Sequence, residues 1–206
     1  AYTAQVILLS LLAFKLCLDK NKLDDNKKLE IINAFENIKT YVSDELQNIE
    51  VCEKLASKIY KNHDIFFLGR KIDFAIALEG CLKLKEISYL HSEAYQSGEL
   101  KHGSIALISE NTPVISIITD EDIALKTISN IKETKARGAY SIVLSSCDLS
   151  HNKDAYDELI QISKVNDFVM PILPIIYLQL IAYYVAKNNG CDIDKPRNLA
   201  KSVTVE

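Results

Sequence analysis

The chain has 206 residues, of which 48% are hydrophobic and 25% charged, and its formal net charge is −4. These proportions are typical of a soluble globular protein, and the length allows a core that needs neither disulfides nor a metal. The acidic balance and the scattered basic residues argue against a nucleic-acid binder and against a basic patch for a membrane surface.

The first third of the chain predicts helices. Residues 3–18 predict a mostly buried helix, and a charged stretch, 19–28, connects it to the next element. Apolar residues recur at helical spacing through 28–49, which predicts one amphipathic helix. A third helix is predicted at 51–62. The chain does not begin with Met and has no basic start typical of a secretory signal, so we expect its first residue to be a cut end.

From residue 64 onward, apolar runs alternate with helical patterns. Strands are predicted at 64–69, 113–119, 140–145 and 167–172, with a further short strand near 92–95. Helices are predicted between them at 73–88, 121–137 and 154–164. Apolar strands that alternate with helices indicate an α/β fold, with about five parallel strands covered by helices on both faces. Ligands of such sheets bind beyond the carboxyl ends of the strands, so the site is expected in those loops. The loops concerned follow Leu68, Tyr95, Thr119, Ser145 and Ile172.

Residues 168–186 carry no formal charge, and this length approaches that of a membrane span. Pro171, Pro174 and Gln179 interrupt the stretch. We therefore interpret it as the end of a buried strand followed by a buried helix at 174–188, and not as a membrane segment.

The five cysteines are an odd number, and no two have the C-x-x-C spacing of a zinc or redox site. They are Cys17, Cys52, Cys81, Cys147 and Cys191. We expect free thiols in a reducing cytoplasm, with no metal, no cofactor and no catalytic thiol.

One predicted helix carries charged residues in an otherwise apolar sequence. Glu79, Lys83 and Glu86 are spaced i, i+4, i+7 and point to one side of the helix. They are either a solvated face or a functional group, in which Glu86 is a general base and Lys83 sets its charge state.

Two further segments contain candidate groups. Residues 96–99 (QSGE) predict a turn before a helix N-terminus, and His102 lies in a loop that suits proton transfer. The tail after residue 194 carries apolar residues and is expected to dock, where Lys201 could form a Schiff base with a ketose. Each has an ordinary alternative: a common turn, an exposed loop histidine and a surface lysine on a loose end.

Five segments, in this order, resemble the isomerase domain of the glucosamine-6-phosphate synthase family. They are 67–70 (FLGR), 77–80 (ALEG), 82–89 (LKLKEISY), 98–103 (GELKHG) and 196–206 (PRNLAKSVTVE). The resemblance covers essentially the whole chain, and the last segment is the most specific. It implies that 51–190 form the second of two sugar-isomerase (SIS) subdomains, each a five-stranded parallel sheet between helices. Residues 1–50 would be helices that close the first subdomain, and 191–206 an active-site tail.

The resemblance also implies an activity, the formation of glucosamine 6-phosphate from fructose 6-phosphate and glutamine-derived ammonia, as the first step of hexosamine synthesis. Glu86 then matches the base that moves a proton between C1 and C2, with Lys83 and Glu79 as its partners. His102 matches the residue for ring opening, which family members supply from the neighbouring subunit of a dimer. Lys201 matches the lysine that forms an imine with the open-chain sugar.

Ala200 joins Lys83 and Lys201 as an implied substrate contact. The implied partners are a sugar phosphate, a glutaminase domain of the same full-length chain and a second subunit, with no nucleic acid, membrane, metal or cofactor, in the cytoplasm. The family's main phosphate loop lies in the first subdomain, so 96–99 is not assigned phosphate binding and the chain alone is expected to be inactive.

Two alternatives remain open. An SIS-family deglycase of fructosamine phosphates would share the sheet and the base, although the tail favours the synthase. A non-catalytic sugar-phosphate sensor with the same fold would need neither Glu86 nor Lys201.

Overall fold

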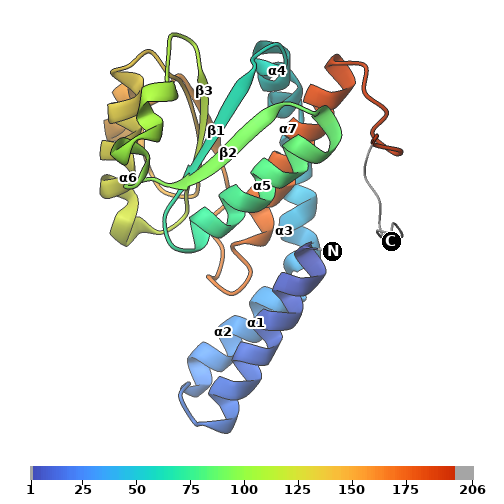
Figure 1. Cartoon of the computed structure of the whole chain (residues 1–206). Helices are drawn as coiled ribbons and strands as arrows, with labels where there is room; N and C mark the ends of the chain where they lie inside the picture. Colours follow the sequence, from blue (N-terminus) through green and yellow to red (C-terminus); the bar gives the residue numbers. More distant parts are fainter. Residues whose placement is uncertain (1, 198–206) are drawn as a thin grey trace, which may run out of the picture.

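The structure, a computed structural model, describes residues 2–197, and its body is a parallel sheet between two layers of helices (Figure 1). The five strands lie in the order β2-β1-β3-β4-β5, and every neighbouring pair is parallel. Their bounds are β1 Asp64–Gly69, β2 His91–Gln96, β3 Pro113–Ile118, β4 Tyr140–Ser145 and β5 Glu158–Gln161. All six residues of β3 are buried, and five of them are apolar, as expected for a strand covered on both faces. The predicted α/β class is confirmed.

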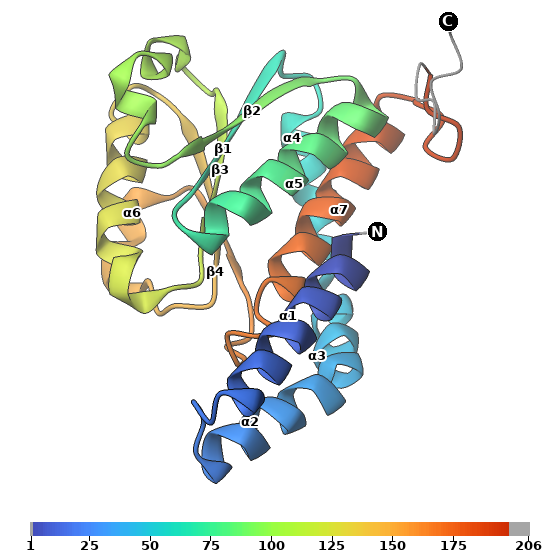
Figure 2. The same cartoon turned by 60° about the horizontal axis from the view of Figure 1, so that its bottom comes forward.

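Helices α4 (Glu50–Ile59), α5 (Ile72–Ser88) and α7 (Ile172–Asn188) cover one face of the sheet, and α6 (Glu121–Lys135) covers the other (Figure 2). The 3₁₀ turns η2 (Leu100–His102) and η3 (Ser104–Leu107) lie on the α6 side, where Leu100 and Ile105 pack with Phe66. Helices α5 and α7 approach closely because α5 has no side chain at Gly80. A Cβ atom there would lie 2.5 Å from a Leu178 side-chain carbon.

The predictions for 154–172 were wrong. The expected helix at 154–164 is a 3₁₀ segment, η4 (Ser150–Ala155), followed by the edge strand β5. Only one β5 residue, Ile160, is fully buried, so the strand lacked the mostly apolar run of β1, β3 and β4. The expected strand at 167–172 is a turn that leads into α7. The Asn166 side chain accepts a hydrogen bond from Phe168 N at 3.1 Å and so favours the turn.

The N-terminal helices are α1 (Tyr2–Asp19), α2 (Asp25–Glu36), α3 (Ile38–Glu45) and the 3₁₀ turn η1 (Leu46–Asn48). Helices α1 and α2 form a hairpin that projects from the body (Figures 1 and 2). The single helix predicted at 28–49 is wrong, because it begins earlier and is interrupted. Asp24 caps α2 by accepting from Lys27 N at 2.8 Å, and the Asn37 side chain ends α2 by donating to Asn33 O at 2.7 Å.

The prediction that the first helix is mostly buried was also wrong. Phe14 is its one buried residue within the described chain, where it packs beside Phe35 and Phe168. The exposed leucines of α1 are Leu8, Leu9, Leu11, Leu12 and Leu16. The hairpin has packing partners on one side, so the apolar sequence of α1 exceeds what this chain can bury. Length and composition would also let α1 cross a membrane, although one such helix near an N-terminus is weak evidence for that.

A buried carboxylate fastens α3 to the body. Glu45, 3% exposed, accepts a hydrogen bond from the Tyr177 hydroxyl at 2.5 Å and another from Ser163 N at 2.8 Å. Burial, and secondly the bond to Glu45, raises the pKa of Tyr177. These bonds satisfy a charge that would be costly to bury alone, and they hold the neighbouring turn η1 against α7.

Asp73, buried in the first turn of α5, joins the carboxyl ends of β1 and β3. Its carboxylate accepts from Thr119 N at 3.0 Å and from the Thr119 hydroxyl. Burial raises its pKa to about 6, although the bonds from Thr119 oppose that rise. An unfolded Asp titrates near pH 4. The folded chain therefore binds more protons between about pH 4 and 6, and its stability falls as the pH rises through that window.

We expect Asp73→Asn to reduce this pH dependence of stability. In the unsubstituted chain it lowers the free energy of unfolding by about 2 kcal/mol across the window. Urea unfolding of the chain at pH 4.5 and 6.5 measures it, with the exposed Asp167→Asn as control. An unchanged slope in Asp73→Asn would mean that another group is responsible.

Candidate functional site

The three charged residues predicted on α5 form one cluster. Lys83 Nζ lies 2.5 Å from a Glu86 oxygen and 3.7 Å from a Glu79 oxygen. The side chains of Glu79, Lys83 and Glu86 are 19%, 30% and 24% exposed. The solvated pair Glu50–Lys54 on α4 has the same i, i+4 spacing, yet its side chains are 84% and 77% exposed. The cluster is thus more sheltered from solvent than the Glu50–Lys54 pair.

A cleft of about 420 Å³ opens beside this cluster between α5, α7 and η1. Its lining residues are Leu46, Lys83, Ile87, Ile176, Gln179, Leu180 and Tyr183. The wall is mostly apolar, with the Lys83 ammonium and the Gln179 amide as its main polar groups. Two features fix the shape of this cleft. They are the close α5–α7 contact at Gly80 and the hydrogen bond from the Tyr177 hydroxyl to Glu45, the residue before Leu46.

Tyr2, at the start of α1, lies near the Glu79 carboxylate. Burial, and secondly the Glu79 carboxylate, raises the pKa of Tyr2 to about 12, so its hydroxyl stays protonated. That hydroxyl donates to Pro171 O at 3.4 Å. Sequence reasoning missed Tyr2, Leu46 and Tyr183. The sequence did indicate Gln179, because it is the lone amide in the uncharged stretch 168–186.

The α5 cluster does not lie at the carboxyl edge of the sheet, where the site is expected. Helix α5 follows β1 and leads into the parallel strand β2, so it returns from the carboxyl edge to the amino edge. Glu86 comes five residues before β2 begins at His91, and Lys83 lines a cleft formed by helices and η1 rather than strand ends. The rule that ligands bind beyond the carboxyl ends of strands concerns groups on loops, whereas the cluster residues belong to a helix.

The structure does not bring His102 to the cluster. It is exposed in η2, beyond the carboxyl end of β2, whereas Glu86 lies before the amino end of that strand. A six-residue strand spans roughly 20 Å. Among the described residues, no hydrogen bond or ion pair joins His102 to Glu79, Lys83 or Glu86. The turn at 96–99 is confirmed, but the helix that follows it has only three residues.

Lys201 and Ala200 lie outside the described residues. The described chain ends at Arg197, whose backbone N–H donates to the Tyr89 hydroxyl at 2.8 Å. Tyr89 is the residue directly after α5, so the tail leaves the body near the end of the helix that carries Glu86.

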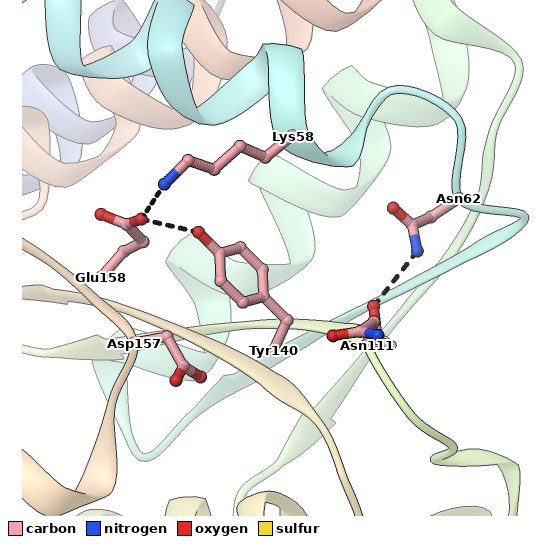
Figure 3. A pocket seen from close by; sticks show the side chains of 6 residues that line it. All are labelled: Lys58, Asn62, Asn111, Tyr140, Asp157 and Glu158. Atoms are coloured by element: carbon pink, nitrogen blue, oxygen red, sulfur yellow. Dashed lines mark hydrogen bonds and ion pairs between the residues drawn. The ribbon is translucent and has the colours of Figure 1, made fainter.

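A second, polar pocket of about 370 Å³ lies at the amino edge of the sheet (Figure 3). Lys58 pairs with Glu158, which also accepts from the Tyr140 hydroxyl at 2.7 Å, and Asp157 pairs with Lys135 at 2.6 Å. Burial and the bond to Glu158 raise the pKa of Tyr140 to about 12. Because its charged groups are paired with one another, this network ties α4 and α6 to the sheet.

No group of three or more His, Cys, Asp or Glu residues within 2–197 is arranged to hold a metal. The five cysteines are free, and burial raises the pKa of Cys52 to about 12. That thiol is therefore a poor nucleophile at neutral pH.

Comparison with known proteins relates the chain to sugar-phosphate enzymes. The SIS domain profile matches residues 58–188. Two curated relatives are named glutamine–fructose-6-phosphate aminotransferase (isomerizing). That of Caldanaerobacter subterraneus subsp. tengcongensis is 47% identical over 206 residues, and that of Clostridium tetani 48%; each match covers the whole chain. The chain spans about a third, 34%, of the length of either relative.

A solved structure is also similar, that of the C-terminal domain of glucosamine-fructose-6-phosphate aminotransferase from Francisella tularensis. It superposes with a TM-score of 0.89 at 34% identity. The superposition covers 95% of this chain and 55% of that one, so nearly half of that domain has no counterpart here.

Proposed function

The chain belongs to the SIS domain family, and from this premise we propose that it is the C-terminal part of the isomerase half of a glutamine–fructose-6-phosphate aminotransferase. The Glu79–Lys83–Glu86 cluster beside the α5–α7 cleft carries the proposal. It offers a sheltered carboxylate next to an ammonium, which is what proton transfer between two neighbouring sugar carbons requires.

The proposed reaction begins when His102 of a neighbouring subunit assists opening of the fructose 6-phosphate ring. The Lys201 amine then attacks C2, so that a C=N bond forms and water leaves. Ammonia displaces the lysine to give the C2 imine. Glu86 takes a proton from C1 and returns it to C2, while the C1 hydroxyl becomes the aldehyde. The sum is fructose 6-phosphate plus ammonia to glucosamine 6-phosphate plus water.

Each remaining residue has a stated part in this proposal. Lys83 holds the Glu86 carboxyl group in place through their 2.5 Å contact, and Glu79 contacts the same ammonium at 3.7 Å. Lys83, Ala200 and Lys201 contact the sugar. The position of His102, a strand length from Glu86, supports a homodimer in which each site draws on two chains.

We further infer the domain organisation. Residues 51–190 form the second SIS subdomain, 1–50 contribute helices to the first, and 191–206 form the active-site tail. The exposed leucines of α1 and the unmatched part of the Francisella domain support a missing neighbour for the hairpin. That neighbour would hold the phosphate loop, since the cleft described here is mostly apolar. A glutaminase domain in the full-length protein would supply ammonia. We place the protein in the cytoplasm, with neither a membrane nor nucleic acid as partner.

The test is to give the full-length parent protein fructose 6-phosphate and glutamine and to measure glucosamine 6-phosphate by NMR. We expect turnover by the parent and none by the 206-residue chain alone, because the latter lacks the phosphate loop. Release of ammonia from fructosamine 6-phosphate without glucosamine 6-phosphate formation would identify the deglycase instead. Sugar-phosphate binding without turnover by the parent would favour the sensor.

A further inference from the structure

Arg70, the residue directly after β1, is half-buried and forms no ion pair with an acidic side chain within residues 2–197. Its Nη2 donates to Asn130 Oδ1 of α6 at 2.8 Å, and Asn130 is itself buried. Its Nε is buried and has no hydrogen-bond partner in the described part of the chain. A buried polar atom without a partner is uncommon and asks for an explanation. Charge pairing does not account for the place of this guanidinium, so its other contacts have to.

The guanidinium also contacts the turn at 96–99, which follows β2. Ser97 N donates to Gly69 O at 2.9 Å, so the turn begins beside Arg70. A Cβ atom on Gly98 would lie 2.9 Å from Nη2 of Arg70, so a side chain at this position would push the guanidinium away. The guanidinium thus packs against the backbone of the turn and bridges it to α6.

The position of His102 depends on this turn. Glu99 N donates to Gln96 O at 2.8 Å and closes the turn, and His102 N donates to Glu99 O at 3.0 Å. Leu100 is buried and fixes the inner side of η2, whereas His102 is exposed. Because no core packing holds the His102 side chain, the turn and η2 decide where it lies. Each step from Arg70 to His102 is a contact between described residues.

We propose that Arg70 is a positioning residue, which holds the turn at 96–99 and thereby places His102 for proton transfer in the site of the neighbouring subunit. The inference rests on the proposed function, in which His102 assists ring opening across a homodimer. Proton transfer requires hydrogen-bond reach, and a misplacement of about 1 Å can slow a reaction roughly 100-fold. Without the guanidinium, the turn loses the group packed against its backbone, so ring opening should slow.

The test is complementation between subunits of the full-length parent, with two tags so that only mixed dimers are purified. In the proposed dimer each site combines Glu86 of one chain with His102 of the other. A mixed dimer of Arg70→Met and Glu86→Gln chains therefore keeps one intact site of two and should form glucosamine 6-phosphate at about half the parental rate. The Arg70→Met homodimer should be about 10- to 100-fold slower than the parent. A mixed dimer no faster than the Glu86→Gln homodimer would refute the role, since Arg70 would then serve the site of its own chain.

Two further variants separate this role from its premise. A mixed dimer of His102→Gln and Glu86→Gln chains tests the shared site itself, and if it is inactive the proposed function fails, not only the role of Arg70. In homodimers, adding Arg70→Met to His102→Gln should cause no further loss, because the group that Arg70 positions is already absent. A further loss as large as that in the parent would make Arg70 merely structural.

Asn130→Leu removes the same hydrogen bond without changing Arg70, and it should complement in the same way as Arg70→Met. Arg137→Met is the matched control, because the Arg137 guanidinium also donates to an uncharged oxygen, Glu133 O at 2.6 Å, but is exposed. Its homodimer should keep the parental rate. An Arg70→Met homodimer that kept the parental rate as well would overturn the proposal.

Discussion

Glu86→Gln in the full-length parent is expected to lower glucosamine 6-phosphate formation by about 10²- to 10⁴-fold, the usual contribution of a general base. The amide keeps the size of the side chain but cannot accept a proton, so the C1–C2 transfer stops while ring opening and imine formation remain possible. Glutamine hydrolysis, which the proposal assigns to another domain, should continue. Separate assays of aminosugar and of released glutamate measure the two activities.

Glu50→Gln is the control for this substitution. Glu50 is also a helical carboxylate spaced i, i+4 from a lysine, but its side chain is 84% exposed and does not line the cleft. Aminosugar formation should be unaffected in Glu50→Gln. If Glu86→Gln retained parental aminosugar formation, the α5 cluster would be a surface feature and the base would have to be another residue.

Gly80→Leu should have the largest effect on stability. The added side chain must enter the space of Leu178, which is 2% exposed and whose nearest carbon would lie 2.5 Å from the new Cβ. Overpacking of this kind costs about 1–3 kcal/mol, which corresponds to a fall of about 5 °C in thermal midpoint for a chain of this size. Because the next two residues, Gln179 and Leu180, line the cleft, aminosugar formation should fall as well.

Ala75→Leu provides the comparison, since it enlarges an exposed residue of the same helix. Its thermal midpoint, measured by calorimetry on the 206-residue chain, should remain within about 1 °C of the midpoint of the unsubstituted chain. Equal midpoints for the Gly80→Leu and parental proteins would show that α7 can move away from α5 without cost.

The sequence predicted the sheet well where strands are buried on both faces. Strands β3 and β4 are mostly apolar, and the prediction matched their bounds to within one residue. The edge strand β5 was missed because only Ile160 is fully buried, so its pattern resembles a helix as much as a strand. The exposure of α1 could not be predicted either, because an apolar helix gives no indication of whether its partner belongs to the same chain.

The site shows a similar division. Spacing alone predicted that Glu79, Lys83 and Glu86 share one face of α5, and the structure confirms their contacts. Spacing could not predict which face of the fold they occupy, or that Tyr2 and Leu46 lie nearby, since these neighbours come from segments remote in sequence. The roles of His102 and Lys201 stay predictions.

The hydrogen bonds that Glu45 accepts limit where the chain can be truncated for expression. A truncation that began at residue 51, where the SIS subdomain is expected to start, would remove the partner of the Tyr177 hydroxyl and of Ser163 N. The buried Tyr177 hydroxyl would then lose its acceptor, and Leu46, which lines the cleft from η1, would be lost as well. A piece that keeps these contacts therefore has to include α3, which begins thirteen residues before residue 51.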